Sequence, residues 1–135
     1  MNTQQFRAAV FGALETWGAA DFPSLPLVFE NGPVPDEDKI GPIWLDMEIR
    51  WYGSHVSSVG ERPRLRDTGA LALNVFHKDA AGTLLPDQIL DALTELLRCK
   101  RLGSALLEAP QRSMPTNLRG WYRVGLLVPF YLDRD

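Results

Sequence analysis

Residues 42–52 alternate apolar and polar side chains more regularly than any other part of the chain. Successive side chains of a strand point to opposite faces, so one face of this segment packs on a core and the other meets water or a polar partner. Parallel strands are usually buried on both faces, and the pattern therefore predicts an antiparallel sheet. The apolar positions are Ile43, Leu45, Met47, Ile49 and Trp51, and the polar positions are Asp46, Glu48 and Arg50.

Four other segments are expected to complete the sheet. Residues 69–77 alternate in the same way, and a long strand is predicted at 120–132. Shorter strands are predicted at 27–30 and 105–113. Pro129 has no backbone N–H to donate to a neighbouring strand, so that end of the last strand is expected at a sheet edge or a bulge.

Two segments carry apolar side chains at the three- and four-residue spacing of an amphipathic helix. The first covers 3–18, with Thr3 as the N-cap and Gly18 at its end, and the second covers 86–102. Together the segments predict an α+β fold, with a single mostly antiparallel sheet and two amphipathic helices on one face, in one domain over 1–135. The helical apolar positions are Phe6, Val10, Leu14 and Trp17, then Ile89, Leu90, Leu93, Leu96 and Leu97.

The chain lacks the sequence patterns of familiar catalytic and cofactor sites, such as a nucleophile elbow or a glycine-rich phosphate loop. His55 and His77 have no partners at metal-ligand spacing. Cys99 is the only cysteine, which excludes an intrachain disulfide, and we interpret it as a buried or half-buried thiol of the second helix. The sequence therefore predicts no enzyme activity, no metal and no cofactor.

Charge and hydropathy limit the classes of partner. The formal net charge of −3 argues against a general nucleic-acid binder that works by bulk electrostatics. No run approaches the roughly 18 apolar residues that a membrane span needs, and the N-terminus lacks the pattern of a secretory signal. We expect a protein of the cytosol in the cell that makes it, without a membrane partner.

Residues 53–68 have no helical or strand period, which predicts a long, functional or mobile loop. Arg62, Arg64 and Arg66 lie in this segment at alternating positions, and an acidic stretch precedes it. Opposite charges on one small subunit suit head-to-tail association between copies, but they are equally compatible with cancellation within one copy. The acids are Asp36, Glu37 and Asp38, in a predicted solvated loop at 34–39, followed by Asp46 and Glu48.

Taken in order, these segments resemble the tail terminator family of long-tailed bacteriophages, and the resemblance covers most of the chain. It begins with the N-terminal helix, the strand and turn at 27–31 and the aromatic strand at 42–52. It continues with Arg66-Asp67-Thr68-Gly69 leading into 70–76, and with Gly82 ahead of the second helix. It ends in Trp121-Tyr122-Arg123-Val124 and Val128-Pro129-Phe130-Tyr131.

The resemblance implies a structural subunit that closes into a sixfold ring on the end of the tail tube. Such a ring stops polymerisation of the tube protein and offers a surface to the neck that joins tail and head. The implied location is the virion tail of a phage or prophage, and the bacterial host cytoplasm during assembly. Arg62, Arg64, Arg66, Asp36, Glu37 and Asp38 become candidate contacts with the tube or a neighbouring subunit. The arginines could instead face DNA in the channel.

Two alternatives remain open. Another head–tail neck or connector protein would meet similar interface demands. A small-molecule-binding or enzymatic α+β domain is the other, with Trp44, Trp51 and Trp121 lining a pocket. Core or interface packing is the better interpretation of these tryptophans, because no convergent polar groups accompany them in the sequence.

Overall fold

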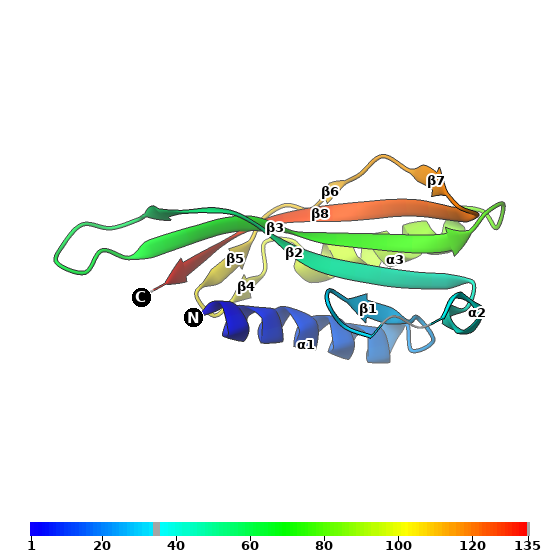
Figure 1. Cartoon of the computed structure of the whole chain (residues 1–135), viewed down its shortest axis with the longest axis horizontal. Helices are drawn as coiled ribbons and strands as arrows, with labels where there is room; N and C mark the ends of the chain where they lie inside the picture. Colours follow the sequence, from blue (N-terminus) through cyan, green and yellow to red (C-terminus); the bar gives the residue numbers. More distant parts are fainter. Residues whose placement is uncertain (34–35, 135) are drawn as a thin grey trace.

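The computed structural model describes residues 1–33 and 36–134, and its centre is one curled, mostly antiparallel sheet with two long helices packed against it (Figure 1). The predicted α+β class and antiparallel sheet are therefore confirmed. The elements in chain order are α1 (Thr3–Asp21), β1 (Leu27–Phe29), α2 (Glu37–Ile40), β2 (Ile43–Val56), β3 (Leu65–Lys78), α3 (Leu84–Leu97), β4 (Arg101–Leu102), β5 (Ala105–Leu107), β6 (Gln111–Arg112), β7 (Thr116–Leu118) and β8 (Trp121–Arg134).

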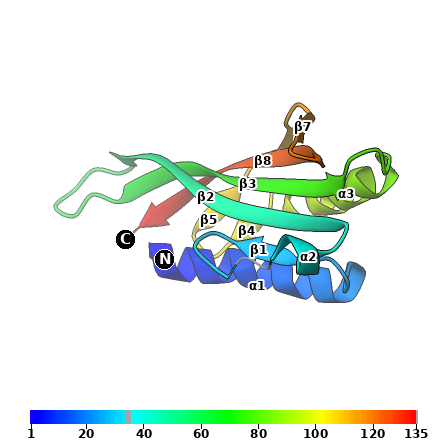
Figure 2. The ribbon, with the colours of Figure 1, turned by 45° about the vertical axis from the view of Figure 1, so that its right-hand side comes forward.

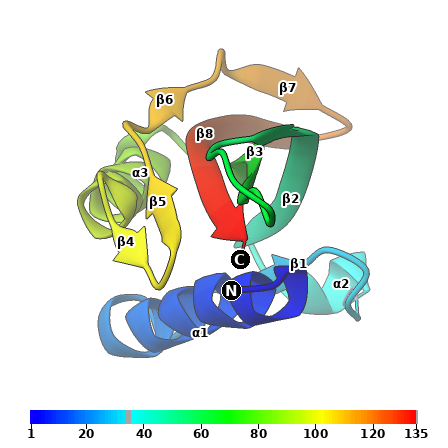
Figure 3. The same cartoon turned by 90° about the vertical axis from the view of Figure 1, so that its left-hand side faces the viewer.

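Three strands of 14 residues each, β2, β3 and β8, form the body of the sheet. The order is β1-β2-β3-β8-β5-β4, and β6 and β7 also pair with β8. Within the described residues only β1 pairs in parallel, against β2. The view along the strands shows how far the sheet curls, with α1 lying below it and β6 and β7 above it (Figure 3).

The main core collects side chains from both long helices and from the inward-pointing positions of the three long strands. We call the opposite side of the sheet the outer face. The helical contributors are Phe6, Val10, Leu14 and Trp17 from α1, and Ile89, Leu90, Leu93 and Leu97 from α3. A smaller cluster on the outer face combines Val28, Ile40 and Trp121, with Trp44 and Phe76 packed against them.

The first helix begins at Thr3, as predicted, but its N-cap and its end differ from the prediction. Asn2, not Thr3, is the N-cap, because its side chain accepts a hydrogen bond from the Gln5 backbone N–H and the Gln5 side chain accepts one from the Asn2 N–H. The helix also continues through Gly18 to Asp21. Gly18 is buried against β1, so the missing side chain serves packing rather than termination.

The second long helix ends at Leu97, five residues before the predicted end at 102. Cys99 lies beyond it, exposed and with a φ of 50°, which contradicts our interpretation of a buried helical thiol. Arg101 belongs to β4 instead of the helix end. The apolar spacing does stop at Leu97, and the basic residues beyond it were misleading as an end signal.

The predicted strand at 105–113 is two short strands, β5 and β6, separated by residues 108–110. The sequence predicts Pro129 at a sheet edge or a bulge. It does not lie at an edge, because β8 lies between β3 and these strands, but the register of β8 shifts by one residue between its pairing with β5 and its pairing with β6. The Pro129 carbonyl accepts from the Glu108 N–H, so its nitrogen faces the same side, where regular pairing is interrupted. The break therefore accommodates the missing donor.

The loop predicted at 34–39 is only partly described. Val34 and Pro35 lie outside the described residues, while 37–40 form the single-turn helix α2. This helix lies under the edge of the sheet beside β1 (Figure 2). In the described part of the chain no helix is both long and apolar enough to cross a membrane.

Candidate interaction surface

Residues 53–68 form a β-hairpin that projects beyond the helices, and we call this segment the hairpin arm (Figure 1). The long loop predicted there is wrong. Strand β2 continues to Val56 and β3 begins at Leu65, which leaves only 57–64 as the connecting loop. Residues 65–68 also pair with 131–134 of β8, so the base of the arm has three strands.

A β-bulge between Trp51 and Gly53 lies where the arm leaves the sheet. The extra residue reverses the alternation of β2, so Ser54 continues the inward-pointing series that Ile49 and Trp51 begin. Ser54 is thereby placed opposite Asp67, its partner on β3. The bulge is the local feature that joins the arm to the core face of the sheet.

A buried carboxylate fixes the arm to both ends of the chain. Asp67 is 4% exposed, accepts a hydrogen bond from the Ser54 hydroxyl and forms an ion pair with Arg134. The Arg134 guanidinium also donates to Thr3 Oγ1 at 2.6 Å, at the start of α1. The ion pair of Asp67 with Arg134 therefore links the arm to the end of β8 and, through Arg134, to the start of α1, which limits movement of the arm at its base.

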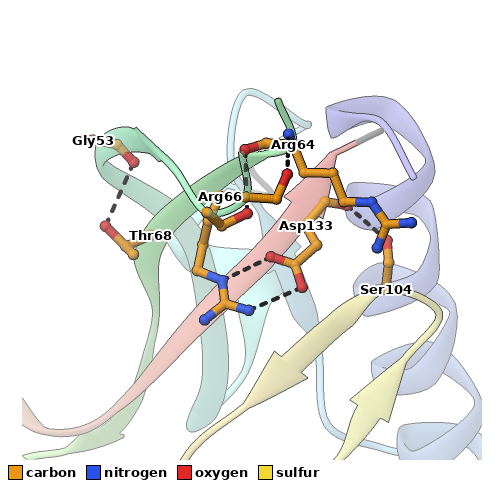
Figure 4. Close-up of polar contacts among 8 residues, drawn as sticks. Gly53, Arg64, Arg66, Thr68, Ser104 and Asp133 are labelled. Carbon is orange, nitrogen blue, oxygen red and sulfur yellow. Dashed lines mark hydrogen bonds and ion pairs between the residues drawn. The ribbon is translucent and has the colours of Figure 1, made fainter. Parts of the chain in front are cut away.

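Arg66 is held within its own chain. Its guanidinium donates two hydrogen bonds to the Asp133 carboxylate, at 2.7 and 3.1 Å (Figure 4). It also lies 3.9 Å from the ring centroid of Tyr131. The hydrogen bond from Arg66 lowers the pKa of Asp133, and the nearby charge of Arg64 contributes in the same direction. Of the three predicted contact arginines, Arg66 thus has a structural partner.

Arg62 and Arg64 lie in the exposed loop of the arm. Among the residues whose side chains the structure describes, neither has a carboxylate within ion-pair distance. The loop itself is ordered by hydrogen bonds: the Arg64 N–H donates to the Ser58 hydroxyl at 2.7 Å, and the Arg64 carbonyl accepts from the Ser57 N–H at 2.8 Å. The two guanidinium groups are therefore presented to solvent from a defined loop.

Apolar side chains accompany these charges on the arm. Val56 and Leu65 pair across the hairpin, on the side that faces the core farther along the sheet, but here no helix covers them. Val59, in the loop of the arm, is 99% exposed, and Tyr52, directly before the arm, is 62% exposed. Exposed apolar side chains close in sequence to two arginines without ion-pair partners in the described part of the chain are the composition expected of a protein contact surface.

The predicted acidic stretch is divided between two places. Asp36 is exposed just before α2, and the side chains of Glu37 and Asp38 lie outside the described residues. Asp46 and Glu48 lie on the outer face of β2. Glu48 pairs with Arg50 at 2.7 Å, so part of the charge segregation is cancelled within one copy.

A hollow of about 430 Å³ lies on the outer face, beside the point where β1 ends. Pairing between β1 and β2 stops at Phe29 and Met47, and the chain turns away through Asn31 and Gly32. Asp46 lies in this outer-face hollow and accepts a hydrogen bond of 2.9 Å from the Asn74 amide. Burial raises the pKa of Asp46, because desolvation and the charge of Glu48 exceed the opposing effects of Asn74 and Arg123.

The tryptophans that might line a ligand pocket take part in aromatic packing. Trp44 stacks on Phe76 with centroids 4.1 Å apart and meets Trp121 edge-on at 6.2 Å. Trp51 packs edge-on against Phe130 at 5.3 Å and also borders a smaller hollow at the base of the arm. In the residues with described side chains no three His, Cys, Asp or Glu are grouped as metal ligands.

Comparison with known proteins supports the fold alone. No protein-family model matches the chain, and no curated protein matches it. Among the solved structures that match is a protein designated only by a sequence identifier. It superposes with a TM-score of 0.76 at 18% sequence identity, covering 100% of this chain and 97% of that one.

Proposed function

We propose that this protein is a structural subunit of a long-tailed phage tail, which forms a ring on the end of the tail tube. The ring stops addition of further tube subunits by covering the surface they would bind, and it offers its other side to the neck proteins that join the tail to the head. The subunit has no catalytic role in this proposal. It resides in the virion, after assembly in the bacterial host cytoplasm.

The observation that carries the proposal is the hairpin arm. It is anchored by Asp67 and Asp133, yet its tip exposes Val56, Val59 and two arginines without ion-pair partners in the described part of the chain. A rigid projection with this surface suits contact with another protein. The resemblance of the element order to tail terminators supports the kind of assembly proposed, a sixfold ring with a tube protein below it.

In this arrangement α1 and α3 form the amphipathic cover of one sheet face, which leaves the outer face and the arm for neighbouring subunits. Passive contact of the arm with DNA in the channel would use the same two arginines, Arg62 and Arg64. The small net charge makes this a secondary contact rather than the basis of binding.

The test is an assembly reaction with the tube protein of the same phage or prophage, with tube lengths measured by electron microscopy. We expect tubes that stop growing when this protein is added, with one ring at a tube end. A protein that binds capsid or neck components but leaves tube length unregulated would instead be a head–tail connector. A protein that neither binds these components nor limits tube length would refute both assignments.

A further inference from the structure

We infer that the hairpin arm of one copy binds the outer-face hollow of the next, with Arg62 and Arg64 placed beside Asp46. This contact rests on the proposed function in that it would join neighbouring subunits of the ring. It assigns the donor surface, the acceptor surface and the charged groups on each. The partner is therefore a second copy of this chain, bound head to tail.

Charge complementarity supports this pairing. The Asp46 carboxylate receives an amide hydrogen bond from Asn74 but has no cation within ion-pair distance in the described part of the chain. Two cations line the hollow: Arg50 is already paired with Glu48, and Arg123 is near enough for its charge to act on Asp46 but forms no ion pair with it in the described part of the chain. A guanidinium is planar and matches a carboxylate with two parallel donors, so an incoming arginine satisfies a half-buried acid better than water or lysine does.

The hollow is large enough to receive these side chains. Its volume of about 430 Å³ falls within the roughly 300–1,000 Å³ of pockets that accept whole small ligands. It is open to solvent beside the edge of β2, because β1 pairs only with residues 45–47. Among the described residues, an arm entering from outside therefore reaches Asp46 without unfolding any helix or strand.

The arm cannot reach the hollow of its own chain. It projects past the helices at the end of the sheet opposite to β7 and α2, whereas β1 and the turn after it border the hollow (Figure 1). The pairing of 65–68 with 131–134 and the ion pair of Asp67 with Arg134 hold that direction. The arm and the hollow thus lie at different places on one rigid body. The contact is therefore heterologous, and each copy can insert its arm into one neighbour and receive the arm of another.

The experiment compares three variants of the full chain by light scattering over a concentration series. The arm variant is Arg62→Glu with Arg64→Glu, the hollow variant is Asp46→Lys, and the third combines all three changes. We expect the wild type to associate and each of the first two to need at least about tenfold higher concentration, because like charges then meet. The combined variant should regain association, since the charges are complementary again.

Matched controls separate this contact from a general effect of charge. Arg98→Glu with Arg119→Glu changes the net charge as the arm variant does, on exposed residues elsewhere, and should leave association unchanged. Asp36→Lys tests the other acidic position and should also leave it unchanged. Thermal melting verifies that each variant folds. If Asp46→Lys does not fold, Asp46→Asn replaces it, and we expect this substitution to weaken association less than Asp46→Lys would.

The inference is overturned if the wild type stays monomeric at every concentration or if the arm and hollow variants associate normally. It is also overturned if the combined variant stays defective, or if Asp36→Lys weakens association and Asp46→Lys does not. The tube-length assay distinguishes this failure from failure of the function. If wild type limits tube length but the variants associate normally, the function stands and this contact is wrong. If the variants behave as expected but tubes grow unchecked, the contact stands and the function is wrong.

Discussion

Asp67 joins the arm to the rest of the fold through buried polar contacts. Its carboxylate is buried and holds Ser54 from β2 and Arg134 from the end of β8. Removing one partner of a buried charged network leaves the other groups unsatisfied, whereas removing an exposed ion pair costs little. The stability of the fold should therefore respond to this acid far more than to acids on the surface.

We predict that Asp67→Ala lowers the free energy of unfolding by about 2 kcal/mol. The loss is smaller than for a fully buried pair, because the Arg134 side chain is 39% exposed and can turn toward water. Urea unfolding followed by circular dichroism measures it. Glu95→Ala, which removes an exposed pair with Arg98, is the control and should change stability by less than about 0.5 kcal/mol. Equal effects of the two substitutions would contradict a structural role for Asp67.

Asp46 gives stability the opposite pH dependence to most carboxylates. Burial raises its pKa above the usual 3.8, so the folded chain holds this proton more tightly than the unfolded chain. Its contribution to stability is fully present below pH 3.8 and is lost as pH rises through the raised pKa. Asp46→Asn, which keeps an acceptor for the Asn74 amide, should therefore be more stable than wild type at neutral pH, and the difference should vanish in acid.

Unfolding curves between pH 3 and pH 7 measure this difference. Asp133→Asn is the matched comparison, because the hydrogen bond from Arg66 lowers the pKa of Asp133. That acid contributes stability above pH 3.8 and loses it as pH falls through the lowered pKa, so its amide variant should be the less stable one at neutral pH. An Asp46→Asn variant that is destabilised at neutral pH would show that another group compensates the buried charge.

At the scale of elements, the sequence predicts a strand well where one face of the strand is buried, and poorly where both faces are exposed. Residues 42–52 and 69–77 alternate because their inner side chains enter the core. The arm carries the same backbone pairing, but its side chains at 53–57 are all exposed, so no apolar alternation marks them. Its strands depend on pairing between 65–68 and 131–134, which are distant in sequence and leave no local pattern.

The candidate interaction surface could likewise be predicted only where it leaves a local pattern in the sequence. Exposed arginines at the arm tip were found because charge spacing is visible in sequence. The ion-pair partners of Asp67 and Arg66 could not be predicted, because each ion pair joins residues 67 positions apart. The outer-face hollow was also missed, because it forms only where the turn after β1 departs from β2. A chain's own long-range pairing decides which predicted charges remain free.

Gly69 marks the junction between the sheet and the arm. A side chain there would overlap the carbonyl oxygen of Arg50 on the paired strand, and its Cβ would also lie 2.9 Å from Phe130 Cζ. Backbone atoms within a paired sheet cannot move aside cheaply, so we predict that Gly69→Ala lowers the free energy of unfolding by at least about 2 kcal/mol.

The control for that change is Gly12→Ala, at a helical position of α1 with nothing within 4 Å of the added carbon. Alanine should stabilise this helix by about 0.5–1 kcal/mol, because glycine is a poor helix former. Thermal unfolding of both variants gives the comparison. A Gly69→Ala variant as stable as wild type would mean that the junction has room to adjust, and the arm would then be less firmly directed than we infer.

For the whole molecule, the topology makes β3 the strand that holds the sheet together. It pairs along its length with β2 on one side and β8 on the other, and Leu71, Leu73 and Val75 are fully buried. The arm loop at 57–64 lies at the far end of this arrangement, outside any core. Local stability should therefore fall along β3 from its centre toward the arm.

Amide hydrogen exchange measures that gradient residue by residue. We predict the slowest exchange at 70–75, with opening free energies that match global unfolding, and faster exchange at 65–68, where an exposed face lowers the cost of local opening. Loop amides at 59–63 should exchange fastest. If copies associate through the arm, exchange at 57–68 should slow as protein concentration rises, while exchange at the centre of β3 changes less. Uniform protection along β3 in the dilute protein would contradict the gradient and would make the arm part of the same cooperative unit as the core.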